Sequence, residues 1–115
     1  MIIKEKDLAS GKTDDFKNKL ICGETLDALK KMPDNSVSLI ITSPSYFLGK
    51  SYEKDHVFNE YLDEHKIILK ECKRVLKETG SIFLHCDRNA VHNLKVICDE
   101  IFGESNFRSE IIWII

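Results

Sequence analysis

Short apolar runs alternate with segments of helical periodicity, and this alternation constrains the fold more than any other feature of the sequence. The runs occupy residues 19–22, 37–42, 81–86 and 109–115. Each is rich in Val, Ile, Leu or Phe and has the length of a strand. The order strand, helix, strand, helix, strand, helix, strand is typical of an α/β fold with right-handed crossovers. We therefore predict a mostly parallel sheet with helices on its faces.

The segments between these runs carry apolar residues every three or four positions, which is the spacing of one helix face. They cover residues 24–32, 58–76 and 91–103. Gly80 is predicted to cap the end of the second helix, because glycine suits the position that follows a helix. Asp87 is predicted to cap the start of the third helix.

The run at residues 37–42 is rich in β-branched residues, as is typical of a strand covered on both faces. Pro44 ends this strand, because proline lacks an N–H and fixes its φ, and it holds Ser43 extended. Ligands of open α/β sheets bind just beyond the carboxyl ends of the strands. Ser43 and Tyr46 would offer a hydroxyl and an aromatic ring to a flat, polar ligand there. An ordinary strand-ending turn is the alternative.

Length and charge limit the classes of protein to which the chain can belong. The 115 residues suffice for one small domain, and 43% hydrophobic with 31% charged residues indicates a soluble globular chain. A net charge of -2 provides no basic field for nucleic-acid binding by this chain alone. If the chain is a catalytic piece, the basic surface that binds nucleic acid would lie outside it. The polar residues 1–18 are predicted to be a flexible lead-in to a domain at residues 19–115.

Cysteine usage and hydropathy favour a cytoplasmic protein. No apolar run is long enough to span a bilayer, and residues 1–18 show no signal-peptide h-region. The four cysteines show no C-x-x-C pairing and are predicted to be buried thiols. A zinc site from Cys86 with His85 or His92 is disfavoured, because adjacent residues on a strand point to opposite faces. We therefore predict no metal, and we expect Trp113 in the core.

A longer pattern surrounds the Ser-Pro turn. Residues 41–46 read Ile-Thr-Ser-Pro-Ser-Tyr. Before them, residues 20–24 read Leu-Ile-Cys-Gly-Glu. After them comes a predicted helix that leads to residues 74–83, which read Arg-Val-Leu-Lys-Glu-Thr-Gly-Ser-Ile-Phe. This order resembles the amino-group DNA methyltransferases over residues 20–115. The resemblance implies a Rossmann-like fold and methyl transfer from S-adenosylmethionine to the exocyclic amine of a flipped base in double-stranded DNA, in a restriction-modification system.

The resemblance also implies roles for individual residues. The family tetrapeptide is Asp, Asn or Ser, then Pro-Pro and an aromatic residue, so Ser43, Pro44 and Tyr46 are the predicted catalytic residues and Ser45 replaces the second proline. The Ser43 side chain and the Pro44 carbonyl would accept the amine hydrogens, and Tyr46 would stack on the base. A leading serine favours cytosine N4 over adenine N6.

Further residues of this pattern have alternative interpretations. Glu24 stands where the family usually has Asp after Gly, so it is predicted to approach the adenine amine of the cofactor; an acid in the first turn of a helix is the alternative. His85 and Asp87 lie at the carboxyl end of the strand at residues 81–86 and would line the same crevice or serve as strand-end and capping residues.

The family's glycine-rich Phe-x-Gly-x-Gly loop and its target-recognition region do not occur in these 115 residues. We therefore expect an N-terminal catalytic portion that is inactive alone and needs a C-terminal half or a second subunit. The alternatives are an inactive truncated remnant, a non-catalytic α/β module and a different Rossmann-like enzyme with a chance Ser-Pro turn.

Overall fold

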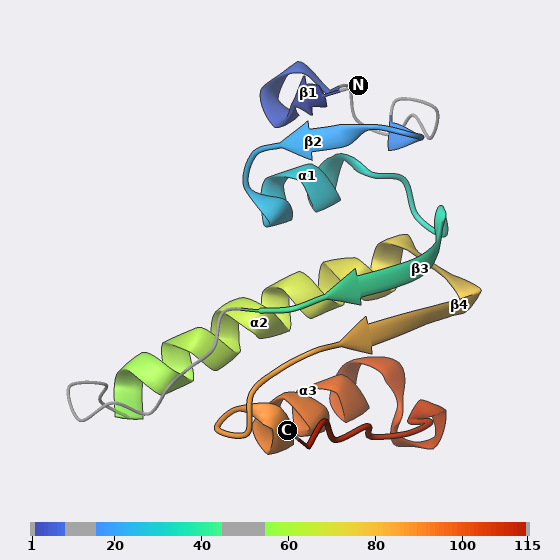
Figure 1. The fold of residues 1–115 in the computed structure, drawn as a ribbon. Coiled ribbons are helices and arrows are strands. Elements are labelled where there is room, and N and C mark those ends of the chain that lie inside the picture. The colour runs from blue at the N-terminus through green and yellow to red at the C-terminus, as the bar shows by residue number, and fades with distance from the viewer. Residues whose placement is uncertain (1, 9–15, 45–54, 115) are drawn as a thin grey trace.

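The computed structural model describes residues 2–8, 16–44 and 55–114, with the side chains of α2 described from residue 58 onward. Two pairs of parallel strands make up its sheets (Figure 1): β1 (Ile2–Lys4) with β2 (Leu20–Cys22), and β3 (Val37–Thr42) with β4 (Leu76–Leu84). The helices are α1 (Thr25–Lys31), α2 (Asp55–Val75) and α3 (Val91–Phe102), with 3₁₀ turns η1 (Glu5–Asp7) and η3 (Glu104–Asn106). The predicted α/β class is confirmed, but the described strands form two sheets instead of one.

Residues 2–7, which lie within the predicted lead-in, carry secondary structure. Strand β1 pairs in parallel with β2, with Ile3 opposite Ile21. Lys31 from the end of α1 donates a hydrogen bond to the carbonyl oxygen of Glu5 at 2.8 Å, and it lies 2.7 Å from the Glu5 carboxylate. Leu8 is buried. Polar composition did not reveal this strand, because its partner lies in a later segment.

Strand β4 begins directly where α2 ends, so the predicted cap at Gly80 is wrong. Val37 pairs with Leu76 and Leu39 pairs with Ser81, which leaves residues 77–80 as a bulge in β4. A Cβ atom at Gly80 would lie 2.7 Å from Leu76 Cδ1. Glycine is therefore needed at position 80, because any side chain there would collide with Leu76 within the bulge.

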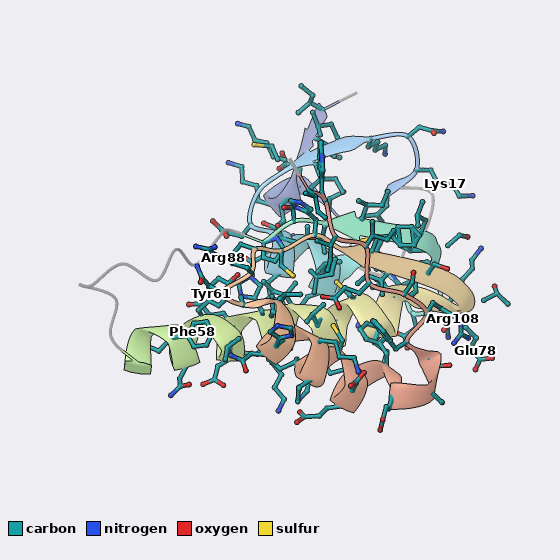
Figure 2. All side chains as sticks on the ribbon, turned by 60° about the horizontal axis from the view of Figure 1, so that its bottom comes forward. Lys17, Phe58, Tyr61, Glu78, Arg88 and Arg108 are labelled. Atoms are coloured by element: carbon teal, nitrogen blue, oxygen red, sulfur yellow. The ribbon has the colours of Figure 1, made fainter. Side chains whose placement is uncertain are left out.

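Helices α2 and α3 cover one face of the β3–β4 pair, and the core lies between them (Figures 1 and 2). The buried side chains of this core are Leu69, Cys72, Val75, Ala90, Leu94 and Ile101. The opposite face is open: Leu39, Ile41 and Phe83 are 53%, 72% and 59% exposed. The prediction that residues 37–42 are covered on both faces is therefore wrong for this chain.

The apolar carboxyl-terminal run is not a strand. Residues 107–114 have neither helix nor strand structure, and the segment runs back beside α3 (Figure 1). Its side chains at Ile111, Ile112, Trp113 and Ile114 are 74–89% exposed, so Trp113 does not lie in the core. The predicted strand at residues 109–115 and the predicted core position of Trp113 are both wrong, because a strand forms only where a partner backbone pairs with it.

Arg74 joins the end of α2 to the turn that leads into β3. Its guanidinium donates to the carbonyl oxygens of Leu29 and Met32 at 2.7 and 2.8 Å. It also donates to the carboxylates of Asp34 at 2.6 Å and Glu71 at 2.7 Å, which together raise the pKa of Arg74. Glu71 and Arg74 are three residues apart on α2, a spacing at which opposite charges on a helix surface pair. This network anchors the amino-terminal end of β3.

We expect the substitution Arg74→Ala to lower the free energy of unfolding by about 2 kcal/mol, because two part-buried carbonyl oxygens lose a charged donor. Chemical denaturation monitored by circular dichroism measures this change. Lys73→Ala is the matched control, since Lys73 is exposed on the same helix and should shift the free energy by less than about 0.5 kcal/mol. Equal effects of the two substitutions would contradict the anchoring role.

Candidate active site at the ends of two parallel strands

The carboxyl ends of β3 and β4 meet at one edge of their sheet. Thr42 is paired with Leu84 at the end of the ladder, and the backbone N–H of His85 donates to the Thr42 carbonyl at 2.9 Å. The arrowheads of β3 and β4 point the same way in Figure 1. Ser43 and Pro44 directly follow Thr42, so the predicted strand end at residues 37–42 is confirmed. The edge is therefore built from residues 42–44 and 84–87.

The structure brings Ser43 and His85 together. Ser43 Oγ lies 3.0 Å from His85 Nδ1, which is a hydrogen bond between residues far apart in the sequence. Both side chains are exposed, and Pro44 is half-buried. The sequence placed His85 at this edge but did not pair it with Ser43. The strand register decides that pairing, because it sets which residues stand opposite each other.

Two residues of the predicted tetrapeptide, Ser45 and Tyr46, lie outside the described residues. The structure thus places Ser43 and Pro44 at the strand end. The catalytic roles of Ser43, Pro44 and Tyr46 stay predictions.

Asp87 supports the turn before α3 but does not cap the helix itself. Its carboxylate accepts the backbone N–H of Asn89 at 3.2 Å, and its carbonyl accepts that of Val91 at 3.1 Å. The N-cap residue of α3 is Ala90, without a side-chain capping bond, so the predicted N-cap is wrong. The other carboxylate oxygen, Oδ1, is buried and has no partner in the part of the chain that the structure describes.

Tyr61 lies near the same edge, although the sequence indicated only an apolar helix position for it. Burial raises the pKa of the Tyr61 phenol, and the negative charges of Asp87 and of a Cys86 thiolate raise it further. The Tyr61 ring is 4.2 Å from the ring of His65, centroid to centroid. Figure 2 shows Tyr61 and Arg88 at one end of the molecule and Glu78 and Arg108 at the other. No sequence signal distinguished Tyr61 from its apolar neighbours.

Glu24 follows the carboxyl end of β2, whose arrowhead points the same way as that of β3 (Figure 1). It is the N-cap residue of α1, is exposed and makes no side-chain capping bond. A Cβ at Gly23 would overlap Glu5 Cβ, so glycine is required before it. An exposed carboxylate in this position can accept a hydrogen bond from an amine. The acid inside the first turn of α1 is Asp27.

The cysteines differ in burial. Cys72 is buried, Cys86 and Cys98 are half-buried, and Cys22 is exposed, so the prediction of four buried thiols is wrong for Cys22. Burial raises the pKa of Cys72 and Cys98 to about 11, which keeps both thiols protonated at neutral pH. Within residues 2–8, 16–44 and 55–114, no group of three His, Cys, Asp or Glu residues is arranged to hold a metal ion.

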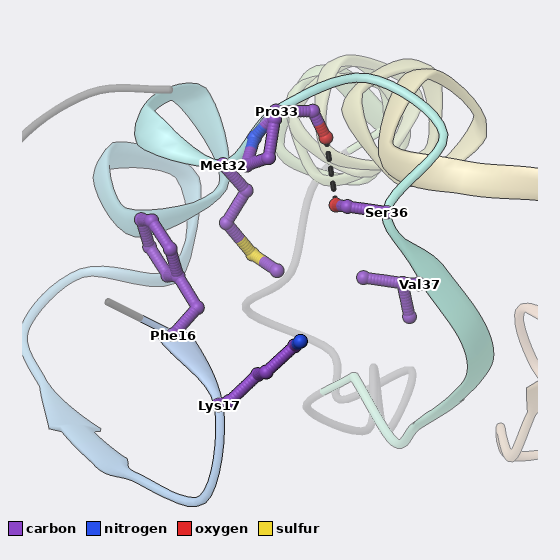
Figure 3. A pocket seen from close by; sticks show the side chains of 6 residues that line it. All are labelled: Phe16, Lys17, Met32, Pro33, Ser36 and Val37. Atoms are coloured by element: carbon purple, nitrogen blue, oxygen red, sulfur yellow. Dashed lines mark hydrogen bonds between the residues drawn. The ribbon is translucent and has the colours of Figure 1, made fainter. Parts of the chain in front are cut away.

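A small cavity of about 110 Å³ lies at the other end of β3 (Figure 3). It is lined by Phe16, Lys17, Met32, Pro33, Ser36 and Val37. The Ser36 hydroxyl donates to the Pro33 carbonyl at 2.7 Å within its wall. Val37 begins β3 and Ser43 follows its end, so this cavity is separate from the strand-end site.

Parallel strands with a polar site beyond their carboxyl ends define an α/β protein of the ligand-binding, Rossmann-like kind. A family model described as DNA methylase, N6_N4_Mtase, matches residues 37–114, which contain β3, Ser43, Pro44, β4 and α3. The chain therefore belongs to this DNA methylase family. None of the described helices is long and apolar enough to cross a membrane.

Known relatives agree with the family. The chain is 38% identical over 98 residues to the type II methyltransferase M.HpaI of Haemophilus parainfluenzae, covering 83% of this chain and 31% of that protein. It is 34% identical to the DNA adenine methyltransferase YhdJ of Escherichia coli, covering 82% of this chain and 32% of YhdJ. It is 44% identical over 66 residues to the type II methyltransferase M.BglII of Bacillus subtilis, covering 57% of this chain and 18% of that protein. The chain thus spans less than a third of each of these relatives.

Proposed function

We propose that this chain carries the base-amine site of a DNA methyltransferase that transfers a methyl group from S-adenosylmethionine to an exocyclic amine of double-stranded DNA. One observation carries the proposal: Ser43 and Pro44 directly follow β3 at the edge where β4 also ends. That is where open α/β sheets bind ligands. The enzyme would act in the cytoplasm as part of a restriction-modification system, as the type II names of two relatives suggest.

The chemistry of the substrate explains the residue types. The lone pair of an aromatic amine is delocalised into its ring, so the amine is a poor nucleophile. The Ser43 side chain and the Pro44 carbonyl can accept its two hydrogens, which favours a pyramidal nitrogen and stabilises the developing positive charge. The base must leave the duplex to reach this edge, and Tyr46 would provide its stacking surface.

S-adenosylmethionine supplies an activated methyl group when it is bound. The exposed carboxylate of Glu24 fits the cofactor's adenine amine as an acceptor, since it is not used for capping α1. A glycine-rich cofactor loop is not part of this sequence. The proposal therefore includes a further part of the enzyme, a C-terminal half or a second subunit, that completes the cofactor site.

Two observations favour different target bases. The serine at position 43 favours the cytosine N4 amine, whereas the relative YhdJ is named as an adenine methyltransferase. We propose cytosine N4 as the target, because the family resemblance links a leading serine more often to cytosine amines and a leading aspartate to adenine. Product analysis decides between the two bases.

The test compares the isolated chain with a chimera in which it replaces the matching part of M.HpaI. With labelled S-adenosylmethionine and DNA, the isolated chain should transfer no label and the chimera should methylate. Digestion to nucleosides should yield N4-methylcytosine. Transfer by the isolated chain would contradict the need for a second part. A folded chimera that binds S-adenosylmethionine but transfers no label would support an inactive remnant instead.

Tyr46 provides a matched pair of variants within the same assay. Tyr46→Ala should lower methylation about 5- to 150-fold, because stacking on a base contributes about 1–3 kcal/mol. Tyr46→Phe keeps the ring and should retain most of the rate. The melting temperature should change little in either variant. A loss of folding in Tyr46→Ala would instead assign Tyr46 to the core.

A further inference from the structure

We propose that His85 acts through Ser43: it holds the Ser43 hydroxyl as an acceptor for the base amine and receives the proton that the amine releases. His85 is thus a positioning residue and a proton acceptor that does not itself touch the base. The inference rests on the proposed function, since it assigns a role within the same site. It is carried by the 3.0 Å contact between Ser43 Oγ and His85 Nδ1.

The backbone makes this contact a defined feature of the fold. The His85 N–H donates to the Thr42 carbonyl at 2.9 Å, which extends the β3–β4 ladder by one bond beyond Leu84. Ser43 follows Thr42 directly, so the two side chains leave neighbouring strands at the same level. Both are exposed, and a base bound over them would exclude water from their hydrogen bond.

The number of donors and acceptors determines what the histidine contributes. A serine hydroxyl has one hydrogen and two lone pairs. When His85 is neutral with its proton on Nε2, Nδ1 accepts the Ser43 hydrogen, and both lone pairs of Ser43 stay available to the amine. In the other tautomer Nδ1–H would occupy one lone pair of Ser43. The first tautomer is therefore the one that makes serine an effective acceptor.

The proton balance of the reaction requires such a group. The amine nitrogen uses its lone pair to form the N–CH₃ bond, while the S–CH₃ bond breaks and its electrons remain on sulfur. The nitrogen then carries a positive charge and must lose one hydrogen as a proton. That proton passes to Ser43 Oγ as the original hydroxyl proton passes to His85 Nδ1. His85 becomes an imidazolium and later releases a proton to water, so Ser43 ends unchanged.

The tautomer can be measured on the 115-residue chain without any activity. Nitrogen-15 NMR of the labelled imidazole should show Nδ1 unprotonated and Nε2 protonated at alkaline pH. Ser43→Ala should change the Nδ1 shift of His85 and leave that of His92, which is exposed on α3, unaltered. A protonated Nδ1 in the native chain, or no response to Ser43→Ala, would overturn the inference.

Rates in the M.HpaI chimera separate proton acceptance from simple packing. His85→Ala should lower kcat about 100-fold, within the range for a proton-transfer group. His85→Asn places an amide oxygen near the position of Nδ1 but cannot take a proton, so its kcat should fall nearly as far. Full activity of His85→Asn would reject the proton transfer. His92→Ala is the matched control and should keep the native rate.

A double substitution distinguishes failure of this inference from failure of the proposed function. In a Ser43→Asp background the carboxylate accepts the proton itself, so His85→Ala should reduce kcat less than about 3-fold. An equal loss in both backgrounds would show a structural role and overturn the inference. The absence of transfer in a folded chimera with native Ser43 and His85 would contradict the proposed function, and the NMR measurement would still test the tautomer.

Discussion

The substitution Ser43→Ala is expected to lower kcat of the M.HpaI chimera by about 100- to 1,000-fold, the range seen when one preorganised charge-stabilising group is removed. In the proposed mechanism this substitution removes an acceptor for one amine hydrogen, together with the hydrogen bond to His85. KM should change little, because the interaction develops mainly in the transition state. Steady-state kinetics with labelled S-adenosylmethionine measures both constants.

Ser38→Ala is the matched control for this prediction. Ser38 is an exposed serine on the same strand, toward the end away from the site. Its substitution should leave kcat within about 2-fold, and neither variant should change the melting temperature by more than about 2 °C, since exposed substitutions alter stability little. A native kcat for the Ser43→Ala variant would show that Ser43 has no catalytic role.

The substitution Leu94→Ala is expected to have the largest effect on stability, lowering the free energy of unfolding by about 3 kcal/mol. Leu94 on α3 has no exposed surface and lies in the core that α2 and α3 form under the β3–β4 pair. Its truncation removes apolar burial and leaves a cavity. A small domain has about 5–15 kcal/mol in total, so the loss is a large fraction.

Val96→Ala provides the control on the same helix, because Val96 is 55% exposed. Urea denaturation should show a shift of less than about 1 kcal/mol for Val96→Ala. Similar shifts for the two variants would mean that α3 does not pack as described. Circular dichroism at low denaturant should show native helix content in both proteins.

Local sequence patterns predicted the elements that local forces govern. The apolar run before Pro44 predicted a strand that ends at Thr42, and the structure has the same bounds. The helix from Val91 to Phe102 followed from apolar spacing and from Gly103, whose φ of 92° suits glycine at a helix end. Periodicity and special backbone positions are properties of a few neighbouring residues, so they can be recognised without knowledge of the fold.

Long-range pairing explains the predictions that failed. The segment 109–114 has strand composition but no strand structure, whereas Ile2–Lys4 forms a strand within a lead-in whose overall composition is polar. In both cases the outcome depends on whether a partner backbone is adjacent, and composition does not contain that information. The same limit applies to Trp113, which is 84% exposed despite its apolar neighbours.

Some features of the candidate site likewise follow from the sequence alone, and others depend on the tertiary structure. The sequence by itself determined the family pattern, the strand end at Thr42 and the polar residues that follow it, because proline stops a strand wherever the chain folds. Only the tertiary structure decided that Ser43 contacts His85 and that one face of β3 stays open. Those features depend on the register between strands and on which helices cover them, and register is a property of two segments that meet only in the folded chain.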